Sequence, residues 1–269
     1  MQYEKTALIY FSPTSTTRLV LEEMAKGIGK EISMDLDITS PEVRNQPSPE
    51  FKESVVIIGA PVYAGRVAKD AVDYFKTLNG SGSLAILVVL YGNREFEDAL
   101  LELKDIVVDK GFIPFAAGAF IGEHSFSNDE FLIAVNRPDD EDRKKAFLFG
   151  KQIADLLNTI EPGTDIIPVQ VPGNFPYREG MGNNAFSFIN VAEDCDDCSI
   201  CVAVCPKNAI DESNAYSTID DNCIFCCACI KACPQQVRTL KNGPIRDKAK
   251  WLNENCSQRK EPQIFLSGI

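Results

Sequence analysis

Nine of the ten cysteines of this 269-residue chain lie between positions 195 and 234, and eight of these nine form two copies of one spacing. Each copy reads C-x2-C-x2-C-x3-C-P. In cubane iron–sulfur proteins with this spacing, the first three thiolates of a copy bind one cluster and the fourth binds the other cluster. The sequence therefore predicts two [4Fe–4S] clusters with interleaved ligands. One ligand set is Cys195, Cys198, Cys201 and Cys233, and the other is Cys223, Cys226, Cys229 and Cys205.

A disulfide framework and a structural zinc site are two simpler explanations of these cysteines. Disulfide frameworks belong to secreted chains, and we expect no signal peptide, because MQYEKTALIYF has neither a basic flank nor a long apolar run. Zinc sites usually take two separated pairs of ligands rather than three at tight spacing and a fourth before proline. The duplicated spacing favours the clusters over both.

Residues 188–240 resemble the bacterial two-cluster ferredoxins. The sequence CPKNAI at 205–210 is similar to the CP-x-x-A-I turn that packs the cluster in that family. One departure is Ser199, where the family often has glycine. Another is Cys227, which directly follows the predicted ligand Cys226. We expect the Cys227 side chain to point away from the cluster and to act as a small buried apolar residue or a spare thiol.

Composition and charge narrow the classes of partner. Hydrophobic residues make up 45% and charged residues 25% of the chain, as in soluble proteins, and no apolar run is long enough to span a membrane. The net charge of −12 argues against nucleic acids and anionic membranes as partners. Acidic residues crowd the cysteines, and they form either a docking face for a basic partner or a solubilising face: Glu193, Asp194, Asp196, Asp197, Asp211, Glu212, Asp220 and Asp221. Abundant unpaired cysteine predicts a reducing cytoplasm.

The first 160 residues alternate between apolar runs and helical patterns. Strands are predicted at 5–11, 31–38, 54–60, 84–90 and 112–120. Helices are predicted from position 18, from the region after 67 to about 78, at 95–110 and at 140–157, and a polar loop at 41–49. This alternation predicts an α/β fold with a five-stranded, doubly wound parallel sheet.

Three loops follow strands of this sheet, and ligands of such sheets bind beyond the carboxyl ends of the strands. The first loop, 12–17, has five hydroxyl residues in six positions and precedes a helix. Free N–H groups and the helix dipole favour an anion there, although a Ser or Thr cap is the simpler explanation. The loops at 61–66 and 91–94 offer aromatic, glycine and amide groups. Together they suit a planar heterocycle that carries a phosphate.

Residues 1–160 resemble a flavodoxin, and GAPVYAGR, YGNREFEDAL and GEHS followed by the paired cysteine motifs resemble the flavodoxin–ferredoxin fusion family of anaerobes. The resemblance implies FMN. The phosphate would lie on Ser12, Thr14, Ser15, Thr16 and Thr17. One side of the ring would face Pro61, Val62, Tyr63, Ala64 and Gly65, and the other would face Tyr91, Gly92, Asn93 and Arg94.

Two arginines lie in the second and third loops, and the single histidine of the chain lies in the GEHS sequence at 122–125. Arg66 and Arg94 would favour the reduced, negatively charged flavin if they lie beside it; the alternative is that both are solvated. The resemblance places His124 near the exposed edge of the flavin, but a lone histidine is more often a hydrogen-bonded loop residue than a catalyst.

Four segments are expected: a flavodoxin-like domain at 1–160, a Pro/Gly-rich linker at 161–187 that packs on a domain surface, a ferredoxin-like domain at 188–240, and a C-terminal extension at 241–269 that packs on the core. The extension is expected to contain a helix near 245–255 and a free thiol at Cys256.

The predicted function is electron transfer between FMN and the two clusters, and on to redox partner proteins with basic docking surfaces. No G-x-G-x-x-G follows a strand, so direct NAD(P)H binding is not expected. An FMN-dependent reductase of a quinone-like or porphyrinogen-like molecule, fed by the clusters, is the alternative, so enzymatic activity stays open. A redox sensor is a third hypothesis. A homodimer could bring the flavin of one chain to the clusters of another.

Overall fold

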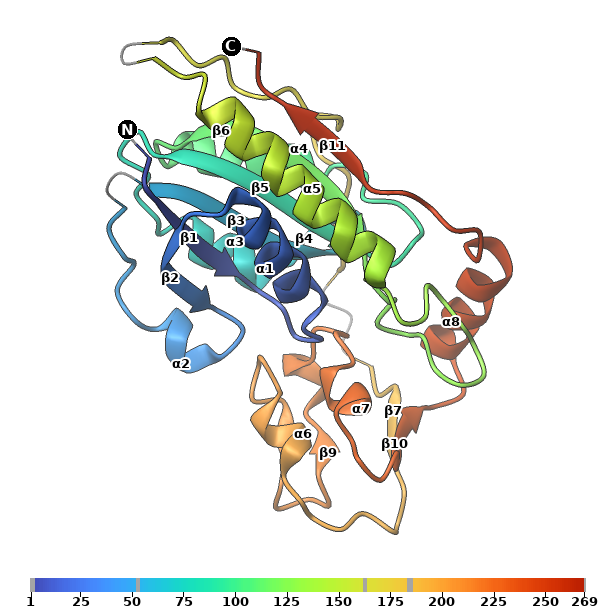
Figure 1. The fold of residues 1–269 in the computed structure, drawn as a ribbon. Helices are drawn as coiled ribbons and strands as arrows, with labels where there is room; N and C mark the ends of the chain where they lie inside the picture. The colour runs from blue at the N-terminus through green and yellow to red at the C-terminus, as the bar shows by residue number, and fades with distance from the viewer. Residues whose placement is uncertain (1–2, 52–53, 162–163, 183–185, 269) are drawn as a thin grey trace.

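Parallel strands form the centre of the N-terminal part of the protein (Figure 1). The computed structural model describes residues 3–51, 54–161, 164–182 and 186–268. Within them, five strands run parallel in the order β2-β1-β3-β5-β6, which is the flavodoxin-like strand order. The strands are β1 Lys5–Tyr10, β2 Glu31–Asp37, β3 Ser54–Tyr63, β5 Leu84–Tyr91 and β6 Ile113–Ile121. The predicted parallel α/β sheet is therefore present.

The central strands are apolar on both faces because helices cover both sides of the sheet. All eight residues of β5 are buried. In β1, Leu8 belongs to the core on one side and Ile9 to the core on the other. A strand in the centre of such a sheet is buried on both faces, so its sequence is continuously apolar rather than alternating between apolar and polar residues.

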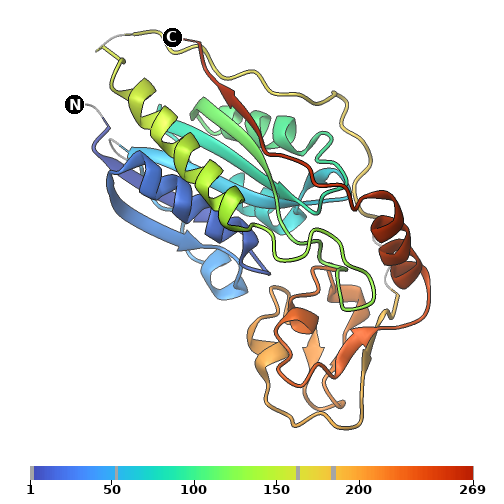
Figure 2. The same cartoon turned by 45° about the vertical axis from the view of Figure 1, so that its right-hand side comes forward.

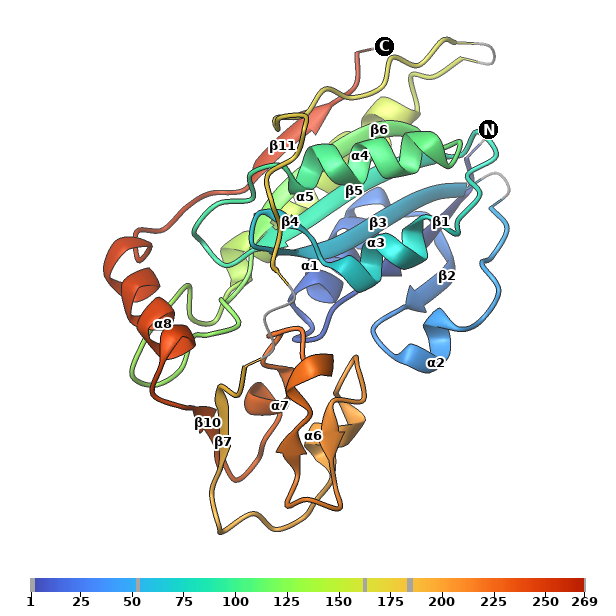
Figure 3. The same cartoon turned by 180° about the vertical axis from the view of Figure 1, so that it is seen from behind.

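Two helices pack on each face of the sheet (Figures 1 and 3). Helices α1 Thr16–Ile28 and α5 Asp140–Leu157 share one core, and α3 Lys69–Phe75 and α4 Ala99–Asp109 share the other. Glycines allow α1 and α5 to approach closely: a Cβ atom on Gly27 would lie 2.0 Å from the carbonyl oxygen of Phe147, and one on Gly150 would lie 2.1 Å from that of Met24. Larger residues at these two positions would push the helices apart.

The C-terminal extension returns to the N-terminal domain (Figure 2). After α8 Pro244–Asn255, strand β11 Gln263–Leu266 pairs antiparallel with β6. A short strand, β4 Arg66–Val67, also pairs with β3. The predicted count of five strands is therefore too low, because an antiparallel edge strand and a hairpin strand join the sheet. Within the described residues, no helix has the length and apolar character needed to cross a membrane.

Several boundaries differ from those predicted. The helix expected from residue 95 begins at Ala99, because a turn at residues 97–98 precedes it. The loop expected at 61–67 is a hairpin, since β3 runs on to Tyr63 and β4 follows. The polar loop at 41–49 contains the short helix α2 Pro41–Arg44, which Ser40 caps.

The segment between the parallel sheet and the cysteine-rich part lies along the N-terminal domain (Figure 3). Val169 is buried, and its N–H donates to the carbonyl of Pro114. The side chain of Asp98 accepts hydrogen bonds from the N–H groups of Asn174 and Arg178. Positions 162–163 and 183–185 of the predicted linker lie outside the described residues.

The cysteine-rich part repeats one backbone pattern. Its short elements are β7 Ile189–Val191, α6 Ile200–Ala203, β8 Ile210–Asp211, β9 Ser217–Thr218, η1 Asp220–Asn222, α7 Ala228–Lys231 and β10 Arg238–Leu240. Ser199 begins α6 at φ 57° and Cys227 begins α7 at φ 56°, each in the left-handed region. Cys227 thus occupies in the second copy the place that Ser199 has in the first.

Candidate functional site

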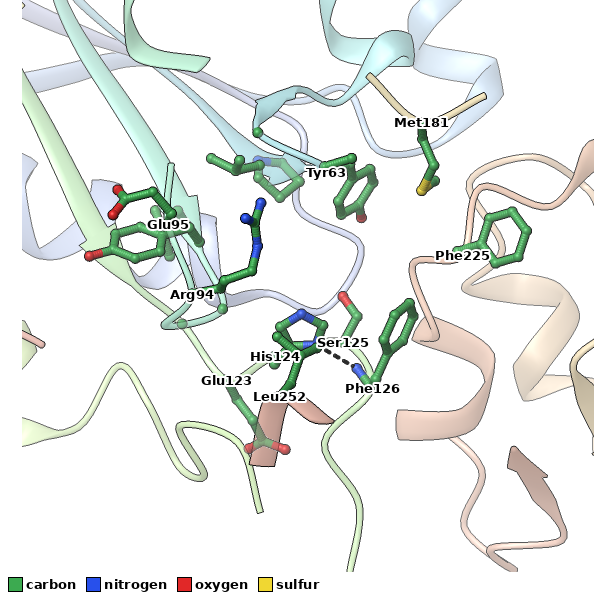
Figure 4. A pocket seen from close by; sticks show the side chains of 18 of the residues that line it. Tyr63, Arg94, Glu95, Glu123, His124, Ser125, Phe126, Met181, Phe225 and Leu252 are labelled. Atoms are coloured by element: carbon green, nitrogen blue, oxygen red, sulfur yellow. Dashed lines mark hydrogen bonds between the residues drawn. The ribbon is translucent and has the colours of Figure 1, made fainter. Parts of the chain in front are cut away.

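A cavity of about 380 Å³ opens at the carboxyl ends of β1, β3, β5 and β6 (Figure 4). Of the residues predicted at the flavin, ten line it: Thr14, Thr16, Pro61, Val62, Tyr63, Ala64, Gly65, Tyr91, Gly92 and Arg94. The other four lie outside the lining: Ser12, Ser15, Thr17 and Asn93. The sheet topology therefore gathers all three predicted loops at one place.

The first loop leads into the N-terminus of α1. Thr14 and Thr16 face the cavity, and Ser12 accepts a hydrogen bond from the N–H of Arg18 through its hydroxyl. The hydroxyl of Ser15 does not cap the helix. Thr17 Oγ1 is buried without a hydrogen-bond partner among the described residues. Unpaired hydroxyl and N–H donors at a helix N-terminus fit a phosphate group.

The second loop is the tight turn between β3 and β4. Ala64 and Gly65 have φ angles of 52° and 82°, as the two central residues of a type I′ hairpin do. A Cβ atom on Gly65 would lie 1.8 Å from Oε2 of Glu97. The glycine is thus required both for its backbone conformation and for the space that Glu97 occupies.

The third loop only partly faces the cavity. The ring of Tyr91 is buried in the core, 5.5 Å from the ring of Phe96. Asn93 is buried, and its Nδ2 donates to the carbonyls of Cys256 at 2.6 Å and Gln258 at 2.8 Å. Asn93 therefore holds the C-terminal extension, a role that the sequence did not suggest.

The two arginines of the loops are paired with carboxylates. Arg66 donates to Glu102 through Nε and Nη2, and Arg94 donates to both oxygens of Glu97 at 3.0 and 2.8 Å. Arg66 lies outside the cavity lining, whereas Arg94 is part of it. Since each charge is compensated, the expected electrostatic help to a reduced flavin is smaller than two unpaired arginines would give.

His124 forms part of the cavity wall, in the loop after β6 (Figure 4). Its Nδ1 accepts a hydrogen bond of 3.0 Å from the N–H of Phe126, so a neutral imidazole carries its proton on Nε2. Burial, with help from Lys231, Arg94 and Lys248, lowers the pKa of His124 to about 4. At neutral pH the histidine is therefore an uncharged hydrogen-bond donor. Gly92 makes room for it, since a Cβ there would lie 2.3 Å from the imidazole.

Part of the cavity wall comes from segments that follow the parallel sheet in the sequence. The linker contributes Arg178 and Met181, the cysteine-rich part contributes Phe225, and α8 contributes Ile245, Lys248 and Leu252. Figure 4 shows Met181 and Phe225 on one side of the open space toward which Tyr63 and Arg94 project. Sequence reasoning missed these residues. The position of Phe225 between two predicted ligands, Cys223 and Cys226, was the one available signal.

The predicted cluster ligands gather around two further, enclosed cavities. One is lined by five cysteines: Cys205, Cys223, Cys226 and Cys229, called the inner set below, and also Cys227, which was expected to point away. The other is lined by Cys195, Cys198, Cys201 and Cys233, called the outer set. These are the two interleaved sets that the spacing predicts.

All ten cysteines are free thiols, which leaves a disulfide framework without support. Among the described residues, no group of three or more His, Cys, Asp or Glu side chains is arranged to hold a single metal ion. Four thiols that face one another without converging on a single point suit a cubane, in which each thiolate binds a different iron atom. Cys227 is buried, and its thiol lies 3.7 Å from the carbonyl oxygen of Phe225.

The inner set is the one next to the cavity of about 380 Å³. Phe225 lines that cavity and stacks on Phe188 at 4.7 Å between ring centroids. Burial raises the pKa of Tyr63 well above its ordinary value, and the neighbouring thiols of Cys226 and Cys227 add to the increase. The loops predicted to hold FMN and the inner set of cysteines thus lie next to each other within one chain.

Polar contacts hold the cysteine-rich part against the N-terminal domain. Lys231 forms an ion pair with Glu123 and donates to the carbonyl of Ser127 at 2.7 Å. Lys207 forms an ion pair with Asp70 at 2.8 Å. Both lysines come from the cysteine-rich part, and their partners lie in the loop after β6 and in α3.

No protein-family model and no curated protein matches this chain. Among solved structures, a flavodoxin from the domain Archaea is 13% identical, with a TM-score of 0.36, over 57% of this chain and 99% of its own. A Fusobacterium nucleatum flavodoxin bound to flavin mononucleotide is 18% identical, with a TM-score of 0.36, over 58% and 99%. The rubredoxin oxygen:oxidoreductase of Desulfovibrio gigas is 14% identical, with a TM-score of 0.39, over 58% of this chain and 36% of its own. With scores this low, the flavodoxin-like fold is assigned from the strand order.

Proposed function

We propose that the protein transfers electrons between FMN, bound in the cavity of about 380 Å³, and two [4Fe–4S] clusters, bound by the inner and outer sets of cysteines. The observation that carries this proposal is the shared wall: Phe225, which lies between two thiols of the inner set, lines the same cavity as the Tyr63 loop. FMN converts between two-electron and one-electron steps and the clusters carry single electrons. The protein supplies their positions, their surroundings and the docking of partners.

The residues at the cavity fit FMN. The first turn of α1 and the hydroxyls of Thr14 and Thr16 would hold the phosphate. The Tyr63 hairpin would cover one side of the ring, and His124 would donate a hydrogen bond from Nε2 to its edge. Gly65 and Gly92 let Glu97 and His124 take their places at the cavity, since a Cβ atom at either glycine would collide with one of these side chains.

The cysteine sets fit clusters for two reasons. The four predicted ligands of each set line one cavity, with the fourth ligand coming from the other copy. Backbone N–H groups also reach the sulfurs, as the N–H of Ala209 reaches Sγ of Cys205 at 3.2 Å. Such hydrogen bonds stabilise thiolate ligands and tune the cluster potential.

The arrangement suggests that electrons pass from FMN to the cluster of the inner set, then to the cluster of the outer set, and then to a partner protein. Cys198 of the outer set is exposed, and so are four acidic residues near it: Glu193, Asp194, Asp196 and Asp197. An acidic rim around an exposed ligand would attract a redox protein with a basic surface, and salt would weaken the encounter.

The direct test is the cofactor content of protein purified without oxygen. We expect one FMN and about eight irons per chain, the content of two cubanes. A double variant in which Cys226 and Cys229 are serine should keep its FMN and lose about half of its iron. Protein that lacks iron while it retains FMN would overturn the proposal.

A second candidate is an FMN-dependent reductase of a small molecule. The observation that favours it is the apolar side of the cavity, with Phe126, Met181 and Leu252 beyond the flavin-type loops and the proton of His124 Nε2 close by. A reductase would consume a quinone-like or porphyrinogen-like acceptor at the expense of a low-potential donor. A carrier would reduce only protein partners.

A further inference from the structure

A buried arginine lies between the two cysteine sets. Arg238, in β10, is only 2% exposed. Its Nη1 donates to the carbonyl of Tyr216 at 2.6 Å, and its Nη2 donates to Oγ1 of Thr218 at 3.1 Å. Its Nε is buried without a hydrogen-bond partner among the described residues.

No carboxylate among the described residues forms an ion pair with Arg238. Its two oxygen acceptors, a carbonyl and a hydroxyl, satisfy N–H donors but carry no net charge. Burial of an unpaired guanidinium is strongly unfavourable, because the charge loses its hydration without gaining a counter-charge. The folded chain therefore buries the positive charge of Arg238 without a carboxylate beside it, and a negative charge has to come from another group.

The nearest groups that can supply negative charge are cysteines of both sets. Nη1 of Arg238 lies 3.9 Å from Sγ of Cys201, which belongs to the outer set. Arg238 also lines the outer cavity. On the other side, Arg238 also interacts with the thiol of Cys229, of the inner set, through a side-chain hydrogen bond and through its charge.

We propose that Arg238 is a shared counter-cation of the two clusters, which donates hydrogen bonds to the thiolates of Cys201 and Cys229 and makes both clusters easier to reduce. This inference rests on the proposed function. A cubane with four thiolate ligands is anionic, and its potential depends on its net charge and on hydrogen bonds to its sulfurs. Each cluster takes up one electron from an added reductant, no bond forms or breaks, and the guanidinium keeps its proton throughout.

The spacing does not dictate this role, since residue 238 lies beyond both motifs. Arg238 is the fifth residue after Cys233, and β10 pairs it with Val191 of β7. Pairing of these two strands aims the side chain inward, between the copies. Arg238 is a positioning residue, because it acts on the clusters through their ligands.

The test compares reduction potentials in wild-type protein and in Arg238→Gln, Arg238→Lys and Lys241→Gln, by EPR-monitored titration without oxygen. For Arg238→Gln we expect the ratio of reduced to oxidised cluster at a given applied potential to fall about tenfold, a shift of about 59 mV for one electron. Both clusters should shift, and Arg238→Lys should shift less because it keeps the charge. Lys241→Gln is the matched control, since it removes a positive charge from the exposed residue just beyond β10.

The iron content separates the two proposals. If wild-type protein lacks iron, the proposed function fails and the role of Arg238 fails with it. If wild type and Arg238→Gln both hold about eight irons and have equal potentials, the role of Arg238 is overturned and the proposed function stands. Equal shifts of the potentials in Arg238→Gln and Lys241→Gln would also overturn the role of Arg238, since the loss of any nearby positive charge would then explain the shift.

Arg238→Gln could fail to assemble its clusters, and a measurement on wild-type protein then decides. We would label the guanidinium nitrogens of arginine with ¹⁵N and record pulsed EPR of the reduced protein. A hyperfine coupling from guanidinium nitrogen is expected, because Arg238 is the one arginine in the described linings of the two cysteine cavities. Absence of this coupling would contradict the proposal.

Discussion

At the scale of single residues, His124 gives the clearest pH dependence. Its pKa falls from 6.5 to about 4 in the folded chain, so between these values the unfolded chain binds the extra proton and the folded chain does not. The free energy of unfolding should therefore decrease as the pH falls from about 6.5 to about 4, by at most roughly 3 kcal/mol.

This prediction can be checked by an NMR titration of the imidazole, which needs no assignment because the chain has one histidine. We expect a midpoint near pH 4 and the Nε2-protonated form at pH 7. A midpoint near 6.5 would show that the side chain is solvated and that its bond with the N–H of Phe126 does not persist.

Gly65 and Gly82 form a matched pair, with φ angles of 82° and 80°. A Cβ at Gly65 would collide with Glu97, whereas at Gly82 nothing lies within 4 Å. Both alanine variants should lose about 1–2 kcal/mol from the left-handed backbone. Only Gly65→Ala should also lower the FMN content of purified protein, because the displaced Glu97 holds Arg94 in the cavity wall. Equal FMN contents in the two variants would contradict this.

At the scale of elements, the first turn of α1 is expected to carry much of the FMN affinity. Thr16→Val removes a hydroxyl from the cavity wall and keeps the shape of the side chain. Loss of one hydrogen bond to phosphate should weaken FMN binding about tenfold. Thr6→Val is the control, because Thr6 Oγ1 is buried in β1 without a partner among the described residues. Fluorescence titration of the apoprotein with FMN measures both, and a similar loss in Thr6→Val would argue against a specific contact.

The C-terminal extension depends on Asn93. Asn93→Ala leaves the carbonyls of Cys256 and Gln258 without their donor, which should cost about 1–3 kcal/mol. Hydrogen exchange of residues 256–266 should become faster while β1 and β3 stay protected. Asn255→Ala, which removes a bond within α8 on the exposed surface, should change this exchange little. No difference between the two variants would contradict the role of Asn93.

Elements also show where sequence reasoning ends. The buried parallel strands were predictable, because β5 reads as one apolar run. Strand β11 was not, since QIFL is short and mostly exposed at the sheet edge. Helix α4 begins later than its pattern suggests because both residues of the turn at 97–98 bind other parts of the chain: Glu97 binds Arg94 and Arg178, and Asp98 binds the linker backbone.

At the scale of the whole molecule, local spacing and tertiary docking contribute different parts of the site. The cysteine spacing indicates which four thiols share a cavity, because each set follows from the copies themselves. The approach of Phe225 and α8 to the Tyr63 hairpin depends on how the two domains pack, through pairs such as Lys231 with Glu123. No single-segment pattern encodes such a pair. The same holds for Arg238, whose surroundings come from both copies.

The central claim is that FMN and the inner set exchange electrons within one chain. The most direct measurement is flash reduction of the flavin in anaerobic protein, followed by the bleaching of cluster absorption at several protein concentrations. Our account predicts a first-order rate constant that stays the same over a tenfold dilution, because Phe225 and Tyr63 line one cavity. A rate proportional to protein concentration, or clusters that stay oxidised until a partner is added, would contradict it.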